Sequence, residues 1–287
     1  MKASSISNYL SLIKFSHTVF ALPFALLGFF LAVKTTQTGL DWKVLGLVVL
    51  CMVFARSAAM AFNRLIDNDV DKDNPRTAIR EIPAGIISKD SALIFIILNS
   101  LFFIAATYFI NRICFYLSPV SLLVILGYSY TKRFTFLCHF ILGLGLSLAP
   151  IGAWLAVTGE FALLPILFSL AVLFWVSGFD IIYALQDEAF DKSKGLHSIP
   201  AAIGTKNALL LSSVFHFFSA AFILSAGFIG NAGVYYWIAA AIFSGLLFYQ
   251  HSLVKPNDLS KVNIAFFTTN GIASIVFASL AIADLYL

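Results

Sequence analysis

Charged residues are scarce in this sequence. They make up 11% of its 287 residues, whereas a typical soluble domain carries about 25%. This scarcity excludes a soluble globular protein, and the 60% of hydrophobic residues excludes a disordered chain. The 3 cysteines show no pairing or metal-ligand spacing, which excludes a disulfide-stapled secreted module. No hydrophilic stretch is long enough to form a separate soluble domain.

Long apolar runs fill the sequence instead. A membrane-spanning helix needs about 20 apolar residues, and nine runs approach that length. They lie at residues 15–33, 44–62, 92–110, 113–130, 134–157, 161–185, 208–229, 234–249 and 264–285. Because backbone groups in lipid must bond to one another, each run is interpreted as a helix. The sequence therefore predicts an all-α, polytopic membrane protein with nine transmembrane helices in a bundle.

Basic residues gather on one side of this predicted bundle. The N-terminus and the connections after even-numbered helices hold all but four of the 18 Lys and Arg residues. The odd-numbered connections hold Lys34, Lys43 and Arg112, and Arg56 lies inside an apolar run. Cytoplasmic loops of membrane proteins are rich in basic residues. We therefore expect a multi-pass protein of the cell inner (cytoplasmic) membrane, with a cytoplasmic N-terminus and the C-terminus on the far side.

Two long acidic connections follow the second and the sixth predicted helix. Their matching placement indicates a duplicated four-helix unit, about residues 1–130 and 134–250, followed by a ninth helix. We expect the whole chain, residues 1–287, to form a single integral-membrane domain.

Acidic residues repeat at helical spacing in both connections. The first holds Asn63, Asp67 and Asp71, and the second holds Asp180, Tyr183, Asp187 and Asp191. These intervals place each set on one face of a helix, where like charges repel one another. Cations between the rows would relieve the repulsion, and Mg²⁺ takes oxygen ligands and bridges carboxylates to phosphate groups. The rows therefore predict a Mg²⁺ site that holds a diphosphate at the cytoplasmic membrane surface.

Basic residues near the rows could contact the diphosphate oxygens directly. They are Arg64, Lys72, Arg76, Arg80, Lys132, Arg133, Lys192 and Lys194. Tyr128 and Lys132 lie four residues apart at the same end, where alone they would be an aromatic-belt residue and a positive anchor. The alternative for the acidic connections is a pair of solvated loops, which we retain for Asp69, Asp73 and Glu188 because they lie off the rows.

Together these elements resemble the UbiA superfamily of intramembrane aromatic prenyltransferases. The acidic segments match its Asn-x-x-x-Asp-x-x-x-Asp and Asp-x-x-Tyr-Ala-x-x-Asp-x-x-x-Asp patterns, and Tyr128 and Lys132 match its Tyr-x-x-x-Lys element. The resemblance covers the whole chain and implies nine helices around a central cavity, with the active site on the cytoplasmic side. One departure is Arg64, since many members have Asp directly after the first Asn. It would change the electrostatics beside the diphosphate.

The resemblance implies Mg²⁺-dependent transfer of a polyprenyl group from polyprenyl diphosphate to an aromatic acceptor. The implied metal ligands are Asn63, Asp67, Asp71, Asp187 and Asp191, and the implied diphosphate ligands are Asn63, Arg76, Tyr128, Lys132 and Lys194. Residues 14–23 and 74–77 are similar to the 4-hydroxybenzoate polyprenyltransferase branch. The expected acceptor is therefore 4-hydroxybenzoate, in quinone biosynthesis. A dihydroxynaphthoate-type acceptor in menaquinone synthesis is the alternative.

The predicted catalytic residues are Tyr128 and Lys132 together with two deeper residues, Arg56 and Asp180. Arg56 lies inside the second predicted helix, seven residues before Asn63, and a charge at membrane depth indicates a functional site. It would pair with an acceptor carboxylate, or form a structural ion pair with Asp180. Asp180 would orient the acceptor hydroxyl or an arginine.

An ion-coupled transporter is the alternative from a different class. A transporter is expected to have acids near the middle of the membrane and broken helices around them, whereas these rows lie at cytoplasmic helix ends. The expected partners are the lipid bilayer, polyprenyl diphosphate and a small aromatic acid. Neither a nucleic acid nor an obligate protein partner is implied. His17, near the start of the first helix, is expected to be a packed polar residue.

Overall fold

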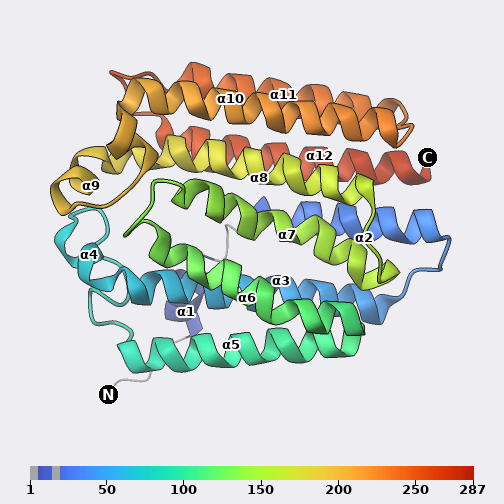
Figure 1. The fold of residues 1–287 in the computed structure, drawn as a ribbon, viewed down its shortest axis with the longest axis horizontal. Helices are drawn as coiled ribbons and strands as arrows, with labels where there is room; N and C mark the ends of the chain where they lie inside the picture. Colours follow the sequence, from blue (N-terminus) through green and yellow to red (C-terminus); the bar gives the residue numbers. More distant parts are fainter. Residues whose placement is uncertain (1–5, 15–19) are drawn as a thin grey trace.

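The structure, a computed structural model, describes residues 6–14 and 20–287, and these form a bundle of helices (Figure 1). The helices are α1 (Ile6–Leu12), α2 (Leu22–Thr36), α3 (Trp42–Ile66), α4 (Asn68–Asp73), α5 (Lys89–Ile110), α6 (Arg112–Thr131), α7 (Cys138–Thr158), α8 (Leu163–Ala184), α9 (Glu188–Lys194), α10 (Ile199–Ile229), α11 (Val234–Leu253) and α12 (Asn270–Tyr286). A 3₁₀ turn at Leu185–Asp187 joins α8 to α9, and a π-helical turn at Ile264–Thr269 leads into α12. Within the described ranges all the regular elements are helices and none is a strand, so the predicted all-α class is confirmed.

Each of the nine predicted runs coincides with a helix, but nine membrane spans stay a prediction. In the described part of the chain, seven helices are long and apolar enough to cross a membrane. The two others are α2, which has 15 residues, and α11. Both pack against other helices of the bundle, α2 against α7 and α12, and α11 against α12 and α10. The first residues of the predicted run 15–33, and with them His17, lie outside the described residues.

The start of α10 differs most from the sequence-based boundary. We expected this helix from residue 208, but it begins at Ile199 because Ser198 caps it, accepting a hydrogen bond from the Ala201 N–H at 3.3 Å. Gly204 interrupts the helix with a φ of 77°, a conformation that glycine adopts without strain. The first turns of α10 therefore extend beyond the predicted apolar run toward the acidic segments.

Helix α8 is the central helix of the bundle. In the apolar 18-residue stretch of the span Leu163–Lys194, 67% of the residues are buried, against 28% in the corresponding stretch of α3 and 22% in those of α5 and α6. It contacts α7 on one side and α10 on the other (Figure 1). Trp175 and Phe179 of α8 pack against Phe24 of α2 and Phe266 before α12. The last turns of this rigid helix carry the second acidic segment.

Both acidic segments lie at the same end of the bundle. Helices α4 and α9 are neighbours there, and the C-terminus lies at the opposite end (Figure 1). We call this end, formed by residues 67–88, 132–137 and 185–198, the acidic end. The bundle therefore brings together two segments that are more than 100 residues apart in the sequence.

A buried polar cluster fastens the start of α12 to the core. The Asn270 amide donates to the carbonyls of Ala265 and Phe266 at 3.1 and 2.9 Å, within the π-helical turn. Its Oδ1 accepts from Trp175 Nε1 at 2.8 Å and from Gln250 Nε2 at 2.7 Å. Buried polar groups need such partners. The cluster therefore satisfies the carbonyl groups of the irregular turn in the apolar interior.

The close contact between α7 and α8 depends on Gly143. A Cβ atom at this position would lie 2.4 Å from the Leu173 carbonyl oxygen and 2.4 Å from Ser177 Oγ. Gly152 on the same helix has no neighbour within 4 Å of such an atom. Small residues allow membrane helices to approach closely, which is how these helices gain packing energy in lipid.

We expect Gly143→Ala to destabilise the bundle by about 1–3 kcal/mol, because the added methyl group overpacks the contact between α7 and α8. The thermal midpoint of the purified protein in detergent should fall. Gly152→Ala is the matched control and should leave the midpoint unchanged or raise it slightly. Equal midpoints for the two variants would contradict the role of Gly143.

Candidate active site

The first acidic segment lies where α3 ends. Asp67 follows the last residue of α3 and has a ψ of 2°, so the row does not lie on one continuous helix as we expected. The spacing nevertheless survives, because the Asp67 N–H bonds to the Asn63 carbonyl at 2.9 Å and the Asp71 N–H bonds to the Asp67 carbonyl at 2.7 Å. The Asn63 amide donates to Asp67 Oδ2 at 2.9 Å. The three side chains thus remain one turn apart across the helix break.

The second acidic segment bends in the same way. Asp180 and Tyr183 belong to α8, Asp187 ends the 3₁₀ turn, and Asp191 belongs to α9. Asp191 is fully buried and accepts a hydrogen bond from the Ser198 hydroxyl at 2.8 Å. The predicted single helical face is therefore divided between two helices and the turn that joins them.

The two segments touch each other through the connection that follows α4. Arg76 binds Asp187 with two nitrogens, Nε to Oδ1 at 3.1 Å and Nη2 to Oδ2 at 2.5 Å. Its Nη1 donates to the Tyr183 hydroxyl at 3.1 Å, and Asn74 Nδ2 donates to Asp187 Oδ1 at 3.3 Å. Farther out, Lys194 Nζ lies 2.5 Å from Asp73 Oδ2. The acidic segments are thus held face to face by basic and amide side chains.

Each of the four carboxylates that we predicted as metal ligands is paired with a lysine or an arginine. Asp71 binds Arg80 at 2.7 and 2.8 Å, Asp187 binds Arg76 as described, Asp191 lies 2.8 Å from Lys132 Nζ, and Asp67 lies 3.6 Å from Arg133 Nη2. The four pairs carry no net charge. Charges that are partly withdrawn from water need such partners. The bases come from two connections, the one after α4 and the one after α6.

The pairing leaves Asp67 short of positive charge. Burial, and next the charge of Asp71, raise the pKa of Asp67 to about 6, although Lys132 and Arg133 oppose this shift. Burial lowers the pKa of Arg76 and Lys132, but the hydrogen bonds and charges of Asp187 and Asp191 outweigh it, so both bases have a raised pKa. The bases therefore stay cationic, while the acidic row can still accept more positive charge.

The donor atoms of the rows fit a hard cation such as Mg²⁺. Asp191 Oδ1 is buried and makes no hydrogen bond of regular geometry, although Lys132 Nζ is close to it. Asn63 donates through its amide nitrogen, which leaves its amide oxygen without a donor in the described part of the chain. Carboxylate and amide oxygens are the ligands that Mg²⁺ takes, together with several waters. Within residues 6–14 and 20–287, however, no three acidic, His or Cys side chains are grouped as a ready-made metal cage.

A largely apolar cavity of about 400 Å³ begins beside the acidic end. Its wall includes Arg56 and Tyr128, and it extends along α3, α6 and α7 to Ile110 and Leu155 near the opposite end. Arg56 Nη2 donates to the Lys14 carbonyl at 3.4 Å, and its Nε is buried with no partner among the described residues. In the same part of the chain, no hydrogen bond to the Tyr128 hydroxyl is present. Both polar groups are thus available to a ligand in the cavity.

The structural ion pair between Arg56 and Asp180, one of our two interpretations of Arg56, does not form among the described residues. Asp180 instead lies 2.6 Å from His139 Nδ1, because α8 packs against α7 whereas α3 lines the cavity. The sequence reasoning missed His139, since its spacing shows no motif. The one available signal is that a histidine lies in the first turn of the otherwise apolar helix α7.

The remaining charged residues near the rows behave differently from one another. Asp69 is exposed and pairs loosely with Lys89 at 3.4 Å, as expected for a residue off the rows. Glu188 pairs with Lys192 at 2.6 Å and also accepts from the Thr205 hydroxyl. Arg64 is buried near Asp71 and Tyr128, and its Nε has no partner among the described residues. Arg64 therefore adds unpaired positive charge beside the first row.

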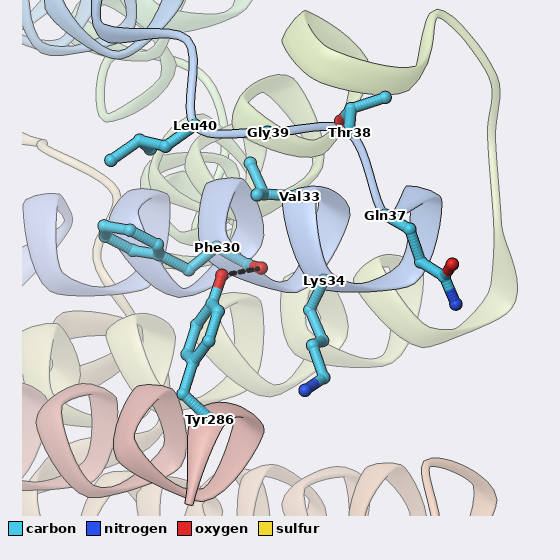
Figure 2. A pocket seen from close by; sticks show the side chains of 8 residues that line it. All are labelled: Phe30, Val33, Lys34, Gln37, Thr38, Gly39, Leu40 and Tyr286. Carbon is cyan, nitrogen blue, oxygen red and sulfur yellow. Dashed lines mark hydrogen bonds between the residues drawn. The ribbon is translucent and has the colours of Figure 1, made fainter.

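A second pocket, of about 480 Å³, lies at the opposite end of the bundle (Figure 2). Lys34 and Tyr286 line it, with Lys34 Nζ 5.3 Å from the centre of the Tyr286 ring. The Tyr286 hydroxyl donates to the Phe30 carbonyl at 3.3 Å. None of the predicted site residues lines this pocket, so we assign the candidate active site to the acidic end and the adjoining cavity.

Known proteins resemble this chain over most of its length. The model of the UbiA prenyltransferase family matches residues 21–272. The 4-hydroxybenzoate octaprenyltransferase of Aliivibrio fischeri (strain MJ11) is 30% identical over 250 residues, which cover 86% of this chain and 85% of that protein. The enzyme of the same name from Nitrosomonas europaea is 29% identical over 248 residues, or 86% of this chain and 84% of that protein.

Solved structures show the same architecture. The apo structure of a UbiA homolog from Aeropyrum pernix K1 has a TM-score of 0.84 and 30% identity, covering 93% of this chain and 98% of that chain. A UbiA homolog from Archaeoglobus fulgidus, bound to GPP and Mg²⁺, has a TM-score of 0.76 at 22% identity, covering 98% of this chain and 100% of that chain. At 22% identity, the similarity to the Archaeoglobus fulgidus homolog supports the fold alone.

We expect Arg80→Gln to lower the stability of the ligand-free protein by about 3 kcal/mol, because Asp71 would be left buried without its cationic partner. Thermal unfolding in detergent with a chelator measures the loss. Lys89→Gln is the control, since it breaks the pair with Asp69 whose side chains are 55% and 80% exposed. That change should cost less than about 1 kcal/mol. Equal losses would show that the buried pair carries no special stability.

Proposed function

Because this chain belongs to the UbiA prenyltransferase family, we propose that it transfers a polyprenyl group from a polyprenyl diphosphate to an aromatic acid, with Mg²⁺ as cofactor. We favour 4-hydroxybenzoate as the acceptor, since relatives with about 30% identity carry the name 4-hydroxybenzoate octaprenyltransferase. The observation that carries the proposal is the meeting of two acidic rows, whose four proposed metal-ligand carboxylates are paired with bases, beside an apolar cavity. Tyr128 lines this cavity and interacts electrostatically with Asp67 and Asp180.

In this proposal the metal ligands are those of the two rows, Asn63, Asp67, Asp71, Asp187 and Asp191. Bound Mg²⁺ would supply positive charge to the diphosphate while the allylic C–O bond breaks. Each carboxylate that turns to a metal ion releases the base that it holds in the ligand-free protein. The site thus has a ready source of positive side chains for the diphosphate oxygens.

Arg76 and Lys132 are the bases best placed for this exchange, since their carboxylate partners are Asp187 and Asp191. Once released, each would donate charge-assisted hydrogen bonds to the diphosphate. The Tyr128 hydroxyl would donate a further bond, and Lys194 would contact the diphosphate from its place at the end of α9. Metal and diphosphate would therefore bind cooperatively. The metal ion would take the carboxylates from the bases, and the diphosphate would take the bases from the carboxylates.

The cavity beside the rows suits the two organic parts of the reaction. Its apolar wall along α3, α6 and α7 would hold the isoprenoid tail inside the membrane. Arg56, with an unpartnered buried Nε, would bind the carboxylate of the aromatic acid near the site. Asp180 would accept a hydrogen bond from the acceptor hydroxyl. The acceptor ring would thus be held between the allylic carbon and these two polar anchors.

The orientation in the membrane follows from the basic residues. Most of them belong to connections at the acidic end, and basic connections face the cytoplasm. We therefore place the active site on the cytoplasmic side of the cell inner membrane. The C-terminus, at the other end of the bundle, would lie on the far side (Figure 1).

The first test concerns the acceptor. Purified protein, Mg²⁺ and a polyprenyl diphosphate are offered 4-hydroxybenzoate and a dihydroxynaphthoate, and the products are identified by mass spectrometry. We expect prenylated 4-hydroxybenzoate, and we expect Arg56→Met to raise the KM for the acid about 10–100-fold, since charged hydrogen bonds contribute about 1.5–3 kcal/mol. The KM for the prenyl diphosphate should not change. If only the naphthoate is prenylated, the naphthoate and not 4-hydroxybenzoate is the acceptor. If neither acid is prenylated, the proposed function is overturned.

The second test concerns the exchange of ionic partners. Asp187→Asn should release Arg76, so that binding of geranyl diphosphate in EDTA becomes about tenfold tighter. The same change should lower Mg²⁺-dependent transfer by about 100-fold or more, because a metal ligand is lost. Asp69→Asn, an exposed carboxylate off the rows, is the control and should change neither quantity. Weaker binding of the diphosphate to Asp187→Asn in EDTA would contradict the exchange.

A further inference from the structure

The buried His139 and the half-buried Asp180 form a pair beside the active site. His139 is 3% exposed, and its Nδ1 lies 2.6 Å from Asp180 Oδ2. Its other ring nitrogen, Nε2, accepts a hydrogen bond from the Ile199 backbone N–H at 3.3 Å. A backbone N–H can only donate, so Nε2 must carry the lone pair and the ring proton must be on Nδ1. The backbone of α10 therefore fixes the tautomer in which His139 donates to Asp180.

The same contacts connect Asp180 to the second acidic row. Ile199 is the first residue of α10, and Ser198 before it donates its hydroxyl hydrogen to Asp191 at 2.8 Å. The start of α10 thus holds the metal-row carboxylate on one side and the His139 ring on the other. Asp180 is in this way kept at a fixed position relative to Asp191.

Asp180 keeps one carboxylate oxygen free of protein donors. In the described ranges its only polar side-chain partner is His139, on Oδ2, and the side chain is 22% exposed. Asp180 lies one turn before Tyr183, whose hydroxyl contacts Arg76, and it interacts electrostatically with Tyr128 across the site. Its free oxygen is therefore available to a small polar group bound beside Tyr128.

We propose that His139 is a positioning residue for prenyl transfer: it holds Asp180 by one oxygen so that the other accepts a hydrogen bond from the acceptor hydroxyl. This inference rests on the proposed function. A hydroxyl that donates to an anion makes its aromatic ring richer in electrons, which favours attack of a ring carbon on the allylic carbon as the C–O bond to diphosphate breaks. The ring carbon then passes its proton to the released diphosphate, which restores aromaticity. Because the carboxylate is oriented before the substrate binds, no reorganisation is needed at the reaction.

A purely structural role is the rival explanation. In that case His139 would serve to fasten α7 to the start of α10 through Ile199, and Asp180 would be a bystander. The two explanations depend on different nitrogens of the ring. The role in positioning needs the donor at Nδ1, whereas the structural role needs the acceptor at Nε2.

Two substitutions distinguish the role of the Nδ1 hydrogen bond from that of the Nε2 hydrogen bond. His139→Asn can place an amide N–H near Nδ1 and keep the bond to Asp180, while His139→Gln can place an amide oxygen near Nε2 and keep the bond from Ile199. We expect His139→Gln to lower kcat about 10–100-fold, as loss of an orienting partner does, and His139→Asn to retain activity within about threefold. The KM for the prenyl diphosphate should be unchanged in both. The opposite ranking, or equal activities, would overturn the positioning role.

A double-mutant cycle tests whether His139 acts through Asp180. In the Asp180→Asn background, His139→Gln should cause no further loss of kcat, whereas additive losses would overturn the proposal. His197→Gln, an exposed histidine at the acidic end, is the control and should retain full activity. Thermal midpoints establish that all variants fold. An inactive wild-type protein would overturn the proposed function and this role with it, while an active wild type with an insensitive His139→Gln would overturn this role alone.

Discussion

The pairing of acids with bases at one end of the bundle is the interaction on which this structure depends. Asp67, Asp71, Asp187 and Asp191 lie where apolar helices end, and such charges are costly without partners. Three of the four partners come from another segment, and Arg80 alone pairs with Asp71 in its own connection, so the ion pairs also join the ends of α3, α6 and α8. The same pairs thus explain why the rows are tolerated and why distant segments meet.

The charge balance of this end also constrains how ligands enter. Four carboxylates and four bases sum to zero, so these four pairs need no counterion in the ligand-free protein. A metal ion alone would displace bases that then lack partners, and a diphosphate alone would meet carboxylates that repel it. Together, in the proposed function, they would replace internal pairs by new pairs of the same kind. Joint binding is therefore favoured over either separate step, in a region where water screens charges weakly.

The sequence predicted what depends on local spacing. The nine apolar runs coincide with helices, and the turn-by-turn spacing of the first row survives even where α3 breaks at Asp67. The break itself was not predicted, since neither glycine nor proline marks it. Partners across the bundle were also beyond prediction. No sequence motif shows whether the partner of Asp180 is Arg56 or His139. Only the packing of α7 on α8 decides between them.

The nature of the partner distinguishes Asp180 of α8 from Asp187 of the 3₁₀ turn and Asp191 of α9. Asp187 and Asp191 face cations, which a metal ion can replace because like charge substitutes for like charge. Asp180 faces a histidine whose tautomer is set by a backbone N–H, and a metal ion cannot take over that hydrogen bond. Binding of metal and diphosphate would therefore release the partners of Asp187 and Asp191 and leave that of Asp180 in place. The segment from the end of α8 to α9 would in this way supply both an exchangeable metal site and a fixed anion for the acceptor.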